Sequence, residues 1–218
     1  MGSRKFSLGG LCTTGTCVAV SLATLAFSQA ASVVARNDSE LHPITLAGGV
    51  LVPNGTGFVA LGTFTISDAQ ISAAPSSPTG RDQLSGDFIG LGSSASFGVG
   101  GEGGLFSSSF VAPINGGDPL DGESIFIVAG NGGSIASSDQ LWVFKSGELF
   151  GTDPFNAELE LDAELATGAV LIGSPVNVLV PSAGRNFEGS EMALMIPEPG
   201  SMALIAFGTI ALLRRRRA

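Results

Sequence analysis

Residues 58–67 read Phe58-Val59-Ala60-Leu61-Gly62-Thr63-Phe64-Thr65-Ile66-Ser67, and they carry the clearest structural signal in the chain. The stretch is rich in Phe, Val and Thr, which favour β-strands. Its second half, 63–67, alternates strictly between polar and apolar side chains. An alternation with a period of two predicts a strand that buries one face.

Short apolar runs of the same kind recur between turns rich in Gly, Pro and Ser. Residues 125–128 are apolar on both faces and predict a central strand that is covered on two sides. Residues 157–165 alternate Ala or Leu with Glu or Asp, which predicts an edge strand with an acidic outer face, although Ala, Glu and Leu also favour helices. The other predicted strands are 88–91, 95–99, 141–144, 169–172, 176–180 and 192–196.

No amphipathic helix of 12 residues stands out between these runs. About eight short strands separated by Gly and Pro turns favour a mainly β fold, a single antiparallel β-sandwich or jelly-roll-like domain. We expect this Gly-rich domain to span residues 31–196. An N-terminal signal helix precedes it, and a C-terminal transmembrane helix follows it.

The first 30 residues have the pattern of a signal peptide. Arg4 and Lys5 form a basic start, and residues 8–27 are apolar or small. Small residues at the −3 and −1 positions then predict cleavage after Ala30, with Ala35 as a second option. The alternative is an N-terminal membrane anchor that is retained.

Both cysteines, Cys12 and Cys17, lie inside this leader. A chain cut after Ala30 would contain no cysteine. This excludes disulfides, thiolate catalysis and cysteine metal sites from the mature protein.

The C-terminal stretch has three parts. A Pro-Glu-Pro-Gly segment predicts an extended break, because proline fixes φ and has no N–H group. The apolar run 202–213 follows. Four arginines then form a basic cluster that is typical of a membrane stop on the cytoplasmic side. The residues are Pro197, Glu198, Pro199 and Gly200, and Arg214, Arg215, Arg216 and Arg217.

The apolar run is short for a membrane span. Its 12 residues would give a helix of about 18 Å, against a hydrocarbon core of about 30 Å. A buried core helix is therefore the alternative. The absence of a polar face and the flanking arginines, whose long side chains reach the interface, favour membrane insertion.

These three parts, in this order, resemble the PEP-CTERM sorting signal of bacterial exported proteins, here over residues 197–218. Gly200-Ser201 stands where the family often has Ser-Thr. The resemblance implies export through the translocon, removal of the leader by signal peptidase and transient anchoring in the inner membrane. It also implies recognition by an exosortase-type transpeptidase that cuts near the Pro-Glu-Pro segment. The expected destination is the cell surface or the extracellular matrix. The body is similar to uncharacterised β-rich bodies of the same class, which adds no activity.

Composition limits the function further. The chain has 32 glycines in 218 residues, and residues 31–196 hold four basic residues against 18 of the 19 acidic ones, a net charge of −14. Such an acidic body argues against nucleic acid as a partner, because phosphates require Lys and Arg. Acidic side chains are compatible with calcium binding, the one cofactor that we consider.

Few residues are suited to catalysis. His42 is the sole histidine, so a Ser-His-Asp triad or a histidine metal site would need it. It precedes Pro43 in a polar stretch, and we interpret it as a solvated linker residue. The segment 98–103 matches G-x-G-x-x-G, but the residues after it do not start a helix, so we do not expect a dinucleotide site there.

Two weak candidate sites remain. Asp118, Asp121 and Glu123 crowd carboxylates into a Gly/Pro loop, which indicates either a solvated acidic turn, a calcium site or, least favoured, a glycosidase pair. Trp142 is either a core residue or, with Phe144 and Phe150, part of a platform that stacks on sugars.

Two tripeptides, 37–39 and 54–56, match the N-glycosylation pattern. Together the signals and the sparse catalytic inventory favour a non-enzymatic exported surface or matrix protein. The alternative is an adhesive module that depends on glycan or calcium, and a glycan hydrolase is the third hypothesis.

Overall fold

The computed structural model describes residues 30–38, 41–113, 117–151, 159–163 and 168–195. The predicted signal helix and the predicted transmembrane helix lie outside these residues. In the part of the chain that is described, no helix has both the length and the apolar character needed to cross a membrane.

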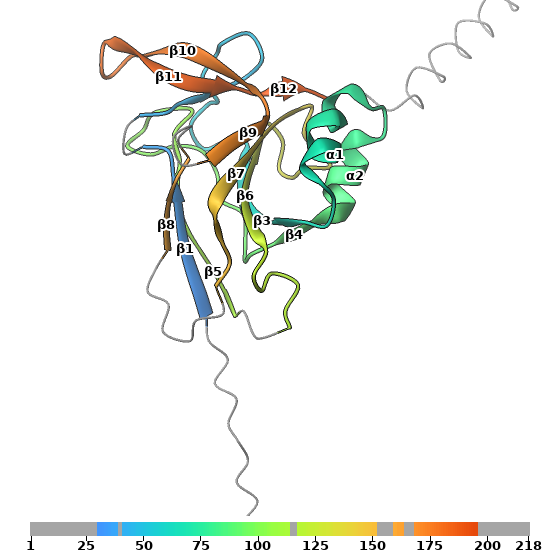
Figure 1. Cartoon of the computed structure of the whole chain (residues 1–218). Coiled ribbons are helices and arrows are strands. Elements are labelled where there is room, and N and C mark those ends of the chain that lie inside the picture. Colours follow the sequence, from blue (N-terminus) through green and yellow to red (C-terminus); the bar gives the residue numbers. More distant parts are fainter. Residues whose placement is uncertain (1–29, 39–40, 114–116, 152–158, 164–167, 196–218) are drawn as a thin grey trace, which may run out of the picture.

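Short strands make up most of the described chain, so the mainly β prediction is confirmed (Figure 1). The strands are β1 Ala30–Arg36, β2 Ile44–Thr45, β3 Phe58–Phe64, β4 Phe88–Gly90, β5 Ser107–Pro113, β6 Ser124–Gly130, β7 Gln140–Leu149, β8 Leu159–Asp162, β9 Gly168–Ile172, β10 Ser174–Val180, β11 Arg185–Glu191 and β12 Ala193–Leu194. The helices are α1 Asp68–Ala73, the 3₁₀ helix η1 Ala74–Ser76 and α2 Gly80–Asp87.

The strands form three sheets. The central sheet has six strands in the order β12-β7-β6-β3-β4, with β9 also paired to β7. The side sheet has the order β5-β1-β8, and the upper sheet has the order β10-β11-β2. Most pairs are antiparallel, but β8 runs parallel to β1 and β2 runs parallel to β11. The expectation of a purely antiparallel fold is therefore wrong at these two pairs.

One face of the central sheet packs against the side sheet. Alternate residues of β3, β6 and β7 point into this layer, where they meet apolar residues of β1, β5 and β8. The central sheet contributes Val59, Leu61, Ile125, Ile127, Ala129, Trp142 and Phe144, and the side sheet contributes Val33, Ala35, Phe110 and Leu161. These residues form the first apolar core, and this layer corresponds to the sandwich that the sequence predicted.

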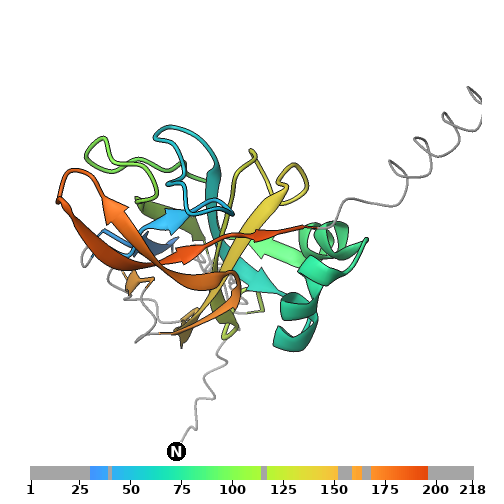
Figure 2. The ribbon, with the colours of Figure 1, turned by 90° about the horizontal axis from the view of Figure 1, so that it is seen from above.

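The opposite face of the central sheet is covered by the helices, which lie together on one side of the molecule (Figures 1 and 2). The intervening residues of the same strands form this second apolar core with Ile71 of α1 and Leu84 of α2. The strand residues are Phe58, Phe64, Phe126, Val128, Leu141 and Val143, which are joined by Ile172 of β9. Residues 125–128 are therefore covered on two sides, as predicted. The predicted half-exposure of 58–67 is wrong, because β3 is buried on both faces almost throughout.

The predicted strand at 58–67 also ends early, since β3 stops at Phe64 and Ser67 caps α1. The Ser67 hydroxyl accepts a hydrogen bond from the Gln70 backbone N–H at 3.4 Å. In return, Gln70 Oε1 accepts one from the Ser67 backbone N–H at 3.1 Å. Such a capping box satisfies N–H groups that a helix start leaves free. It can start a helix too short to show an amphipathic pattern in the sequence.

The predicted edge strand at 157–165 is observed over β8, which lies at the edge of the side sheet. Leu161 is buried, and Asp162 faces outward, where its carboxylate pairs with Arg36 Nε at 3.0 Å. The chain then changes sheet at one residue: Gly173 alone separates β9 of the central sheet from β10 of the upper sheet. Its φ of 117° is a conformation that residues with a side chain rarely adopt.

Other local predictions fail. Residues 95–99 form no strand and make only the isolated bridges Ala95–Val59 and Val99–Glu102. The strands β1, β2, β5 and β11 were not predicted. Three sheets and a helical layer also differ from the two packed sheets of a jelly roll. All described elements and both apolar cores lie within residues 30–195. This part of the chain therefore has the pairing and the core that it needs to fold on its own.

Candidate functional site

The folded domain is hydrogen-bonded up to its last described residue. Ala193 pairs with Leu141 of β7, and the Met195 N–H donates to the Asp139 carbonyl at 2.8 Å. The Met195 side chain is buried. The predicted sorting residues follow immediately: Pro197, Glu198, Pro199, Gly200, Arg214, Arg215, Arg216 and Arg217 lie outside the described residues. A cut within that segment would leave every described element intact.

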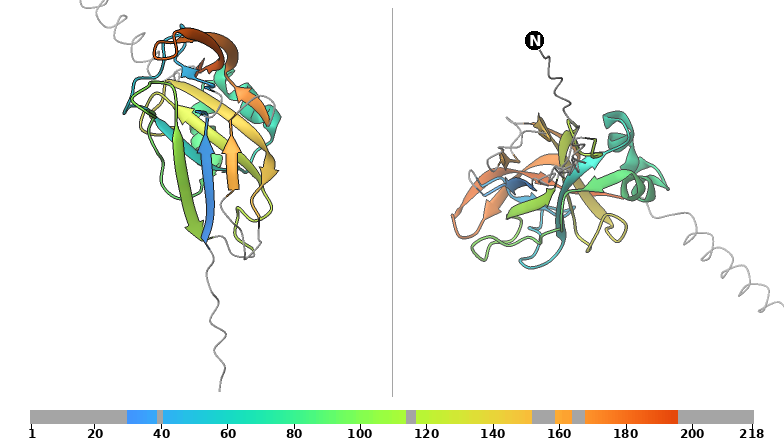
Figure 3. Two further views of the ribbon diagram at one scale, coloured as in Figure 1. Left: turned by 90° about the vertical axis from the view of Figure 1, so that its left-hand side faces the viewer. Right: turned by 90° about the horizontal axis from the view of Figure 1, so that it is seen from below.

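The N-terminal boundary of the domain also lies at a predicted cleavage site. β1 begins at Ala30, whose backbone pairs with Pro113 of β5 (Figure 3). A cut after Ala30, the predicted site, would leave this strand almost whole. A cut after Ala35 would remove Val33 and Ala35 from the first apolar core, where both are buried. Of the two predicted cuts, only the one after Ala30 would keep both residues in the domain.

His42 is not the solvated linker residue that we expected. Its side chain is only 7% exposed, and Nε2 lies 3.2 Å from the Ser190 hydroxyl of β11. Burial lowers the pKa of His42 below its usual value, and the negative charge of Glu188 acts in the opposite direction. Ser190 is completely buried, so this Ser-His pair has no access for a substrate. The pair joins β11 to the segment between β1 and β2.

Asn37 is a second buried polar residue in the same segment as His42, and it is 1% exposed. Its Nδ2 donates to the backbone carbonyls of His42 at 2.9 Å and Gly104 at 3.0 Å, and its Oδ1 accepts from the Phe106 N–H at 2.6 Å. A buried amide with three hydrogen bonds is no acceptor for a glycan, so the match at 37–39 is not a modification site in the fold. Asn54, in the second match, lies in an exposed turn. We call Asn37, His42 and Ser190 the buried junction.

The buried junction was missed because nothing local in the sequence marks it. Arg36 to Pro43 is polar, and polar stretches are more often solvated. The partners of Asn37 and His42 lie 67 and 148 residues away along the chain. Only the arrangement of β1, β5 and β11 brings them together.

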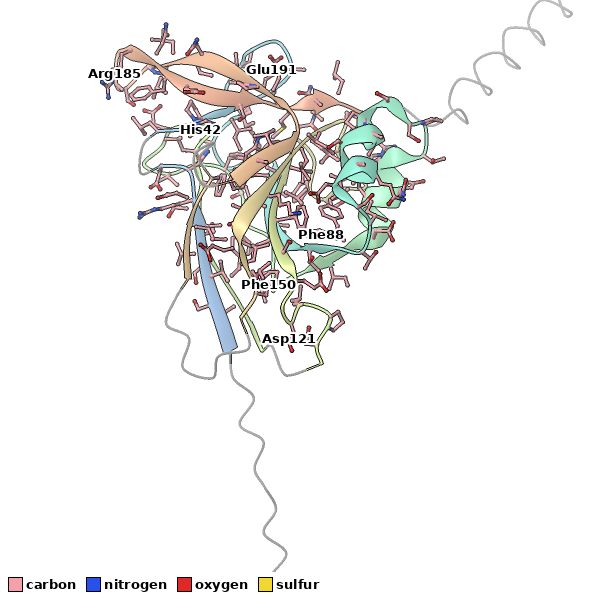
Figure 4. The ribbon with its side chains drawn as sticks, viewed as in Figure 1. His42, Phe88, Asp121, Phe150, Arg185 and Glu191 are labelled. Carbon is pink, nitrogen blue, oxygen red and sulfur yellow. The ribbon has the colours of Figure 1, made fainter. Side chains whose placement is uncertain are left out.

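The acidic candidate residues lie at the other end of the domain, where Figure 4 labels Asp121. Asp118 Oδ1 accepts a hydrogen bond from the Leu120 N–H at 3.1 Å, and Asp121 Oδ2 accepts one from the Gly117 N–H at 3.3 Å. Glu123 acts through its backbone, whose carbonyl accepts a hydrogen bond from the Phe150 N–H at 2.9 Å. Two of the carboxylates thus stabilise their own turn. Within the described ranges, no three His, Cys, Asp or Glu side chains gather where they could hold a metal ion.

Trp142 is a core residue and not a stacking platform. Its side chain is 0% exposed, and its ring stacks on Phe144 with centroids 5.7 Å apart. Phe150 is also buried. The hypothesis of a sugar platform at these residues is therefore wrong, because Trp142, Phe144 and Phe150 are all buried.

The glycine-rich segment 98–103 forms a tight turn, with the Glu102 N–H donating to the Val99 carbonyl at 3.0 Å. No helix follows it before β5 begins at Ser107. Among the described residues, the loop therefore lacks the helix N-terminus that the dinucleotide fingerprint places directly after its glycines.

A pocket of about 200 Å³ lies beside the helical layer, between β3, β4 and the loop before β7. Its apolar lining comes from Phe58, Ala60, Phe88 and Ile135, and its hydroxyls come from Ser85, Ser94 and Ser134. The pocket has room for a small ligand of about one sugar ring. Sequence reasoning did not find it, because its residues come from four separate segments.

The comparisons with known proteins identify the C-terminal segment. The model of the PEP-CTERM protein-sorting motif matches residues 196–217. The chain thus carries this motif, as its residues predicted, and the match begins one residue after Met195. The motif supports an exported protein that is processed by an exosortase-type enzyme. Neither the curated proteins nor the solved structures contained a match to the chain.

Proposed function

We propose that this protein is a non-enzymatic component of the cell surface or extracellular matrix, and that residues 31–195 are the part delivered there. In this proposal the leader directs export, and the tail anchors the precursor in the inner membrane. An exosortase-type transpeptidase then cuts near Pro197-Glu198-Pro199. The single observation that carries the proposal is the position of the sorting motif. It starts at residue 196, directly after Met195, the last residue that the structure describes and one that is hydrogen-bonded to the domain.

The buried junction supports a structural role for the domain. Its histidine, the sole one in the chain, is used to join β11 to the segment after β1. The acidic composition fits an exported protein as well. Residues 31–196 carry a net charge of −14, so copies of the protein repel one another in solution.

The sorting step is tested by replacing Pro197, Glu198 and Pro199 with alanine in the full chain, expressed in a host that has an exosortase. The variant is expected to stay in the membrane fraction at its uncut mass, while the wild type is released. Pro53→Ala, in an exposed turn, is the matched control and is expected to be released normally. Release of the triple variant at the same mass as the wild type would refute this role of the segment.

The adhesive alternative, binding of glycan or calcium, draws on the pocket near Phe88 and on the acidic turn at Asp118 and Asp121. Calorimetry of residues 31–195 with calcium and with polysaccharide from the host separates it from the leading proposal. Binding heat and a higher melting temperature would favour the adhesive module. A hydrolase, the third hypothesis, would have to release sugars from a glycan panel and lose that activity in Asp118→Ala and Asp121→Ala.

A further inference from the structure

The β10–β11 hairpin extends from the upper end of the domain, and β10 forms the outer edge of its sheet (Figures 1 and 3). β10 pairs with β11 on one side only. Among the described residues, no backbone group of the 176–179 segment bonds outside this hairpin. Unpaired N–H and C=O groups along an edge form a template for one more strand.

The sequence of this edge favours pairing. Residues 176–180 read Val-Asn-Val-Leu-Val, with three β-branched side chains and no charge, proline or glycine. Val178 and Val180 are buried against the domain, whereas Leu179 is 57% exposed. Short uncharged segments with high strand propensity are those that pair between chains.

The other edges of the described sheets are protected. β2, β4 and β12 have only two or three residues, and β8 has four residues and carries Asp162. β5 ends at Pro113, and the loop at Gly92 lies against the backbone of Val111. β9 has α1 beside it. Short, charged or covered edges resist pairing with another chain. β10 has Pro175 near its start, but its residues 176–180 have none of these features.

The partner that fits such an edge is another extended strand without like charges opposite it. A second copy of β10 meets this condition. In an antiparallel pairing centred on Val178, the Val176 of one copy lies opposite Val180 of the other, and Asn177 lies opposite Leu179. The two copies are then related by a two-fold axis, which makes the contact self-complementary and closed. Elsewhere the acidic surfaces repel, so β10 is where two copies can approach.

We propose that β10 is a self-association edge through which two copies of this protein pair, residues 176–180 of one against the same residues of the other. The pairing continues the upper sheet from one copy into the next. It gives a surface or matrix protein a contact with its own kind that needs no cofactor. The inference concerns the folded domain and does not depend on the sorting route.

The experiment measures the mass of residues 31–195 in solution over a range of concentrations, by light scattering and sedimentation. The wild type is expected to shift from monomer to dimer as its concentration rises. Leu179→Lys places a charge in the paired edge and is expected to weaken the dimer by about tenfold or more. The matched control is Leu149→Lys, at a leucine that is also 57% exposed but lies at the end of β7. It makes the same change in net charge and is expected to leave the dimer unchanged.

Hydrogen exchange gives a second readout. In the wild type, amides of the 176–180 segment should exchange more slowly at high concentration than at low concentration, and Leu179→Lys should abolish that difference. Equal melting temperatures of the two lysine variants show that both are folded. A wild type that stays monomeric at all concentrations would overturn the proposal. So would a dimer that the two substitutions weaken equally.

Discussion

The buried junction at Asn37, His42 and Ser190 and the acidic turn at Asp118, Asp121 and Glu123 are both polar clusters, yet they differ in what their side chains do. In Figure 4, His42 lies beneath the upper hairpin, and Asp121 lies at the opposite end of the domain. The junction joins segments far apart in the sequence and is hidden from water. In the turn, the hydrogen bonds described for the Asp118 and Asp121 side chains reach neighbours within four residues. Polar residues thus serve tertiary structure in one place and local structure in the other.

The difference lies in what the backbone around each cluster requires. The carbonyls of His42 and Gly104 and the N–H of Phe106 are brought into the interior, where an unpaired group costs about 1–3 kcal/mol. The Asn37 amide satisfies all three. In the acidic turn, the hydrogen bond of Asp121 is exposed and that of Asp118 is only part-buried, so water can replace a lost side chain more easily there.

Asn37→Ala is expected to have the largest effect. It leaves the buried His42 carbonyl and the buried Phe106 N–H without their partner, whereas the Gly104 carbonyl keeps the Ile44 N–H as a donor. The substitution should lower the free energy of unfolding of residues 31–195 by about 2–4 kcal/mol. Urea unfolding followed by tryptophan fluorescence measures this. The control is Asn54→Ala in an exposed turn, with an expected change below about 0.5 kcal/mol. Similar losses in the two variants would remove the contrast between buried and exposed polar residues.

The pH dependence of stability tests His42 next. Because burial lowers its pKa in the folded state, the unfolded chain binds a proton more readily, and protonation favours unfolding. The contribution of neutral His42 to the stability of the fold is complete above pH 6.5, the pKa of histidine in the unfolded chain. It is lost as the pH falls from there through the lower pKa of the folded state. The melting temperature should therefore fall as the pH is lowered from about 7 to about 5.

His42→Gln is the control for this effect, since glutamine offers Ser190 a hydrogen-bonding group but does not titrate. The variant is expected to show a shallower drop over the same pH range. A drop as steep as that of the wild type would mean that other groups, and not His42, account for the pH dependence.

The acidic turn is expected to respond least. Asp118→Ala and Asp121→Ala each remove one hydrogen bond near the surface, so each should cost less than about 1 kcal/mol. Calcium should leave the melting temperature of the wild type unchanged if these carboxylates serve only their turn. A rise with calcium that both substitutions abolish would instead make the turn a binding site and reverse its place in the comparison.

An element could be predicted from the sequence where neighbouring residues carried the pattern that marks it. The apolar residues at 125–128 predicted a two-sided central strand, and β6 is one, because a run without polar side chains has no face to expose. The alternation of apolar and acidic residues around Leu161 predicted the edge strand β8, because it gives a strand one face to bury and one face to expose. Helix α1 escaped prediction, since its start depends on one capping pair, Ser67 and Gln70, and its burial depends on the central sheet.

The sequence by itself determined the sorting motif, the mainly β character and the acidity of the body, because each is written in neighbouring residues or in composition. Only the tertiary structure decided that His42 and Asn37 are buried, that Trp142 is out of reach of a ligand, and that helices form a third layer. It also left the outer edge of β10, which is uncharged over residues 176–180, without a described partner strand. These outcomes depend on contacts between segments up to 148 residues apart, such as that of His42 with Ser190, which no local pattern encodes.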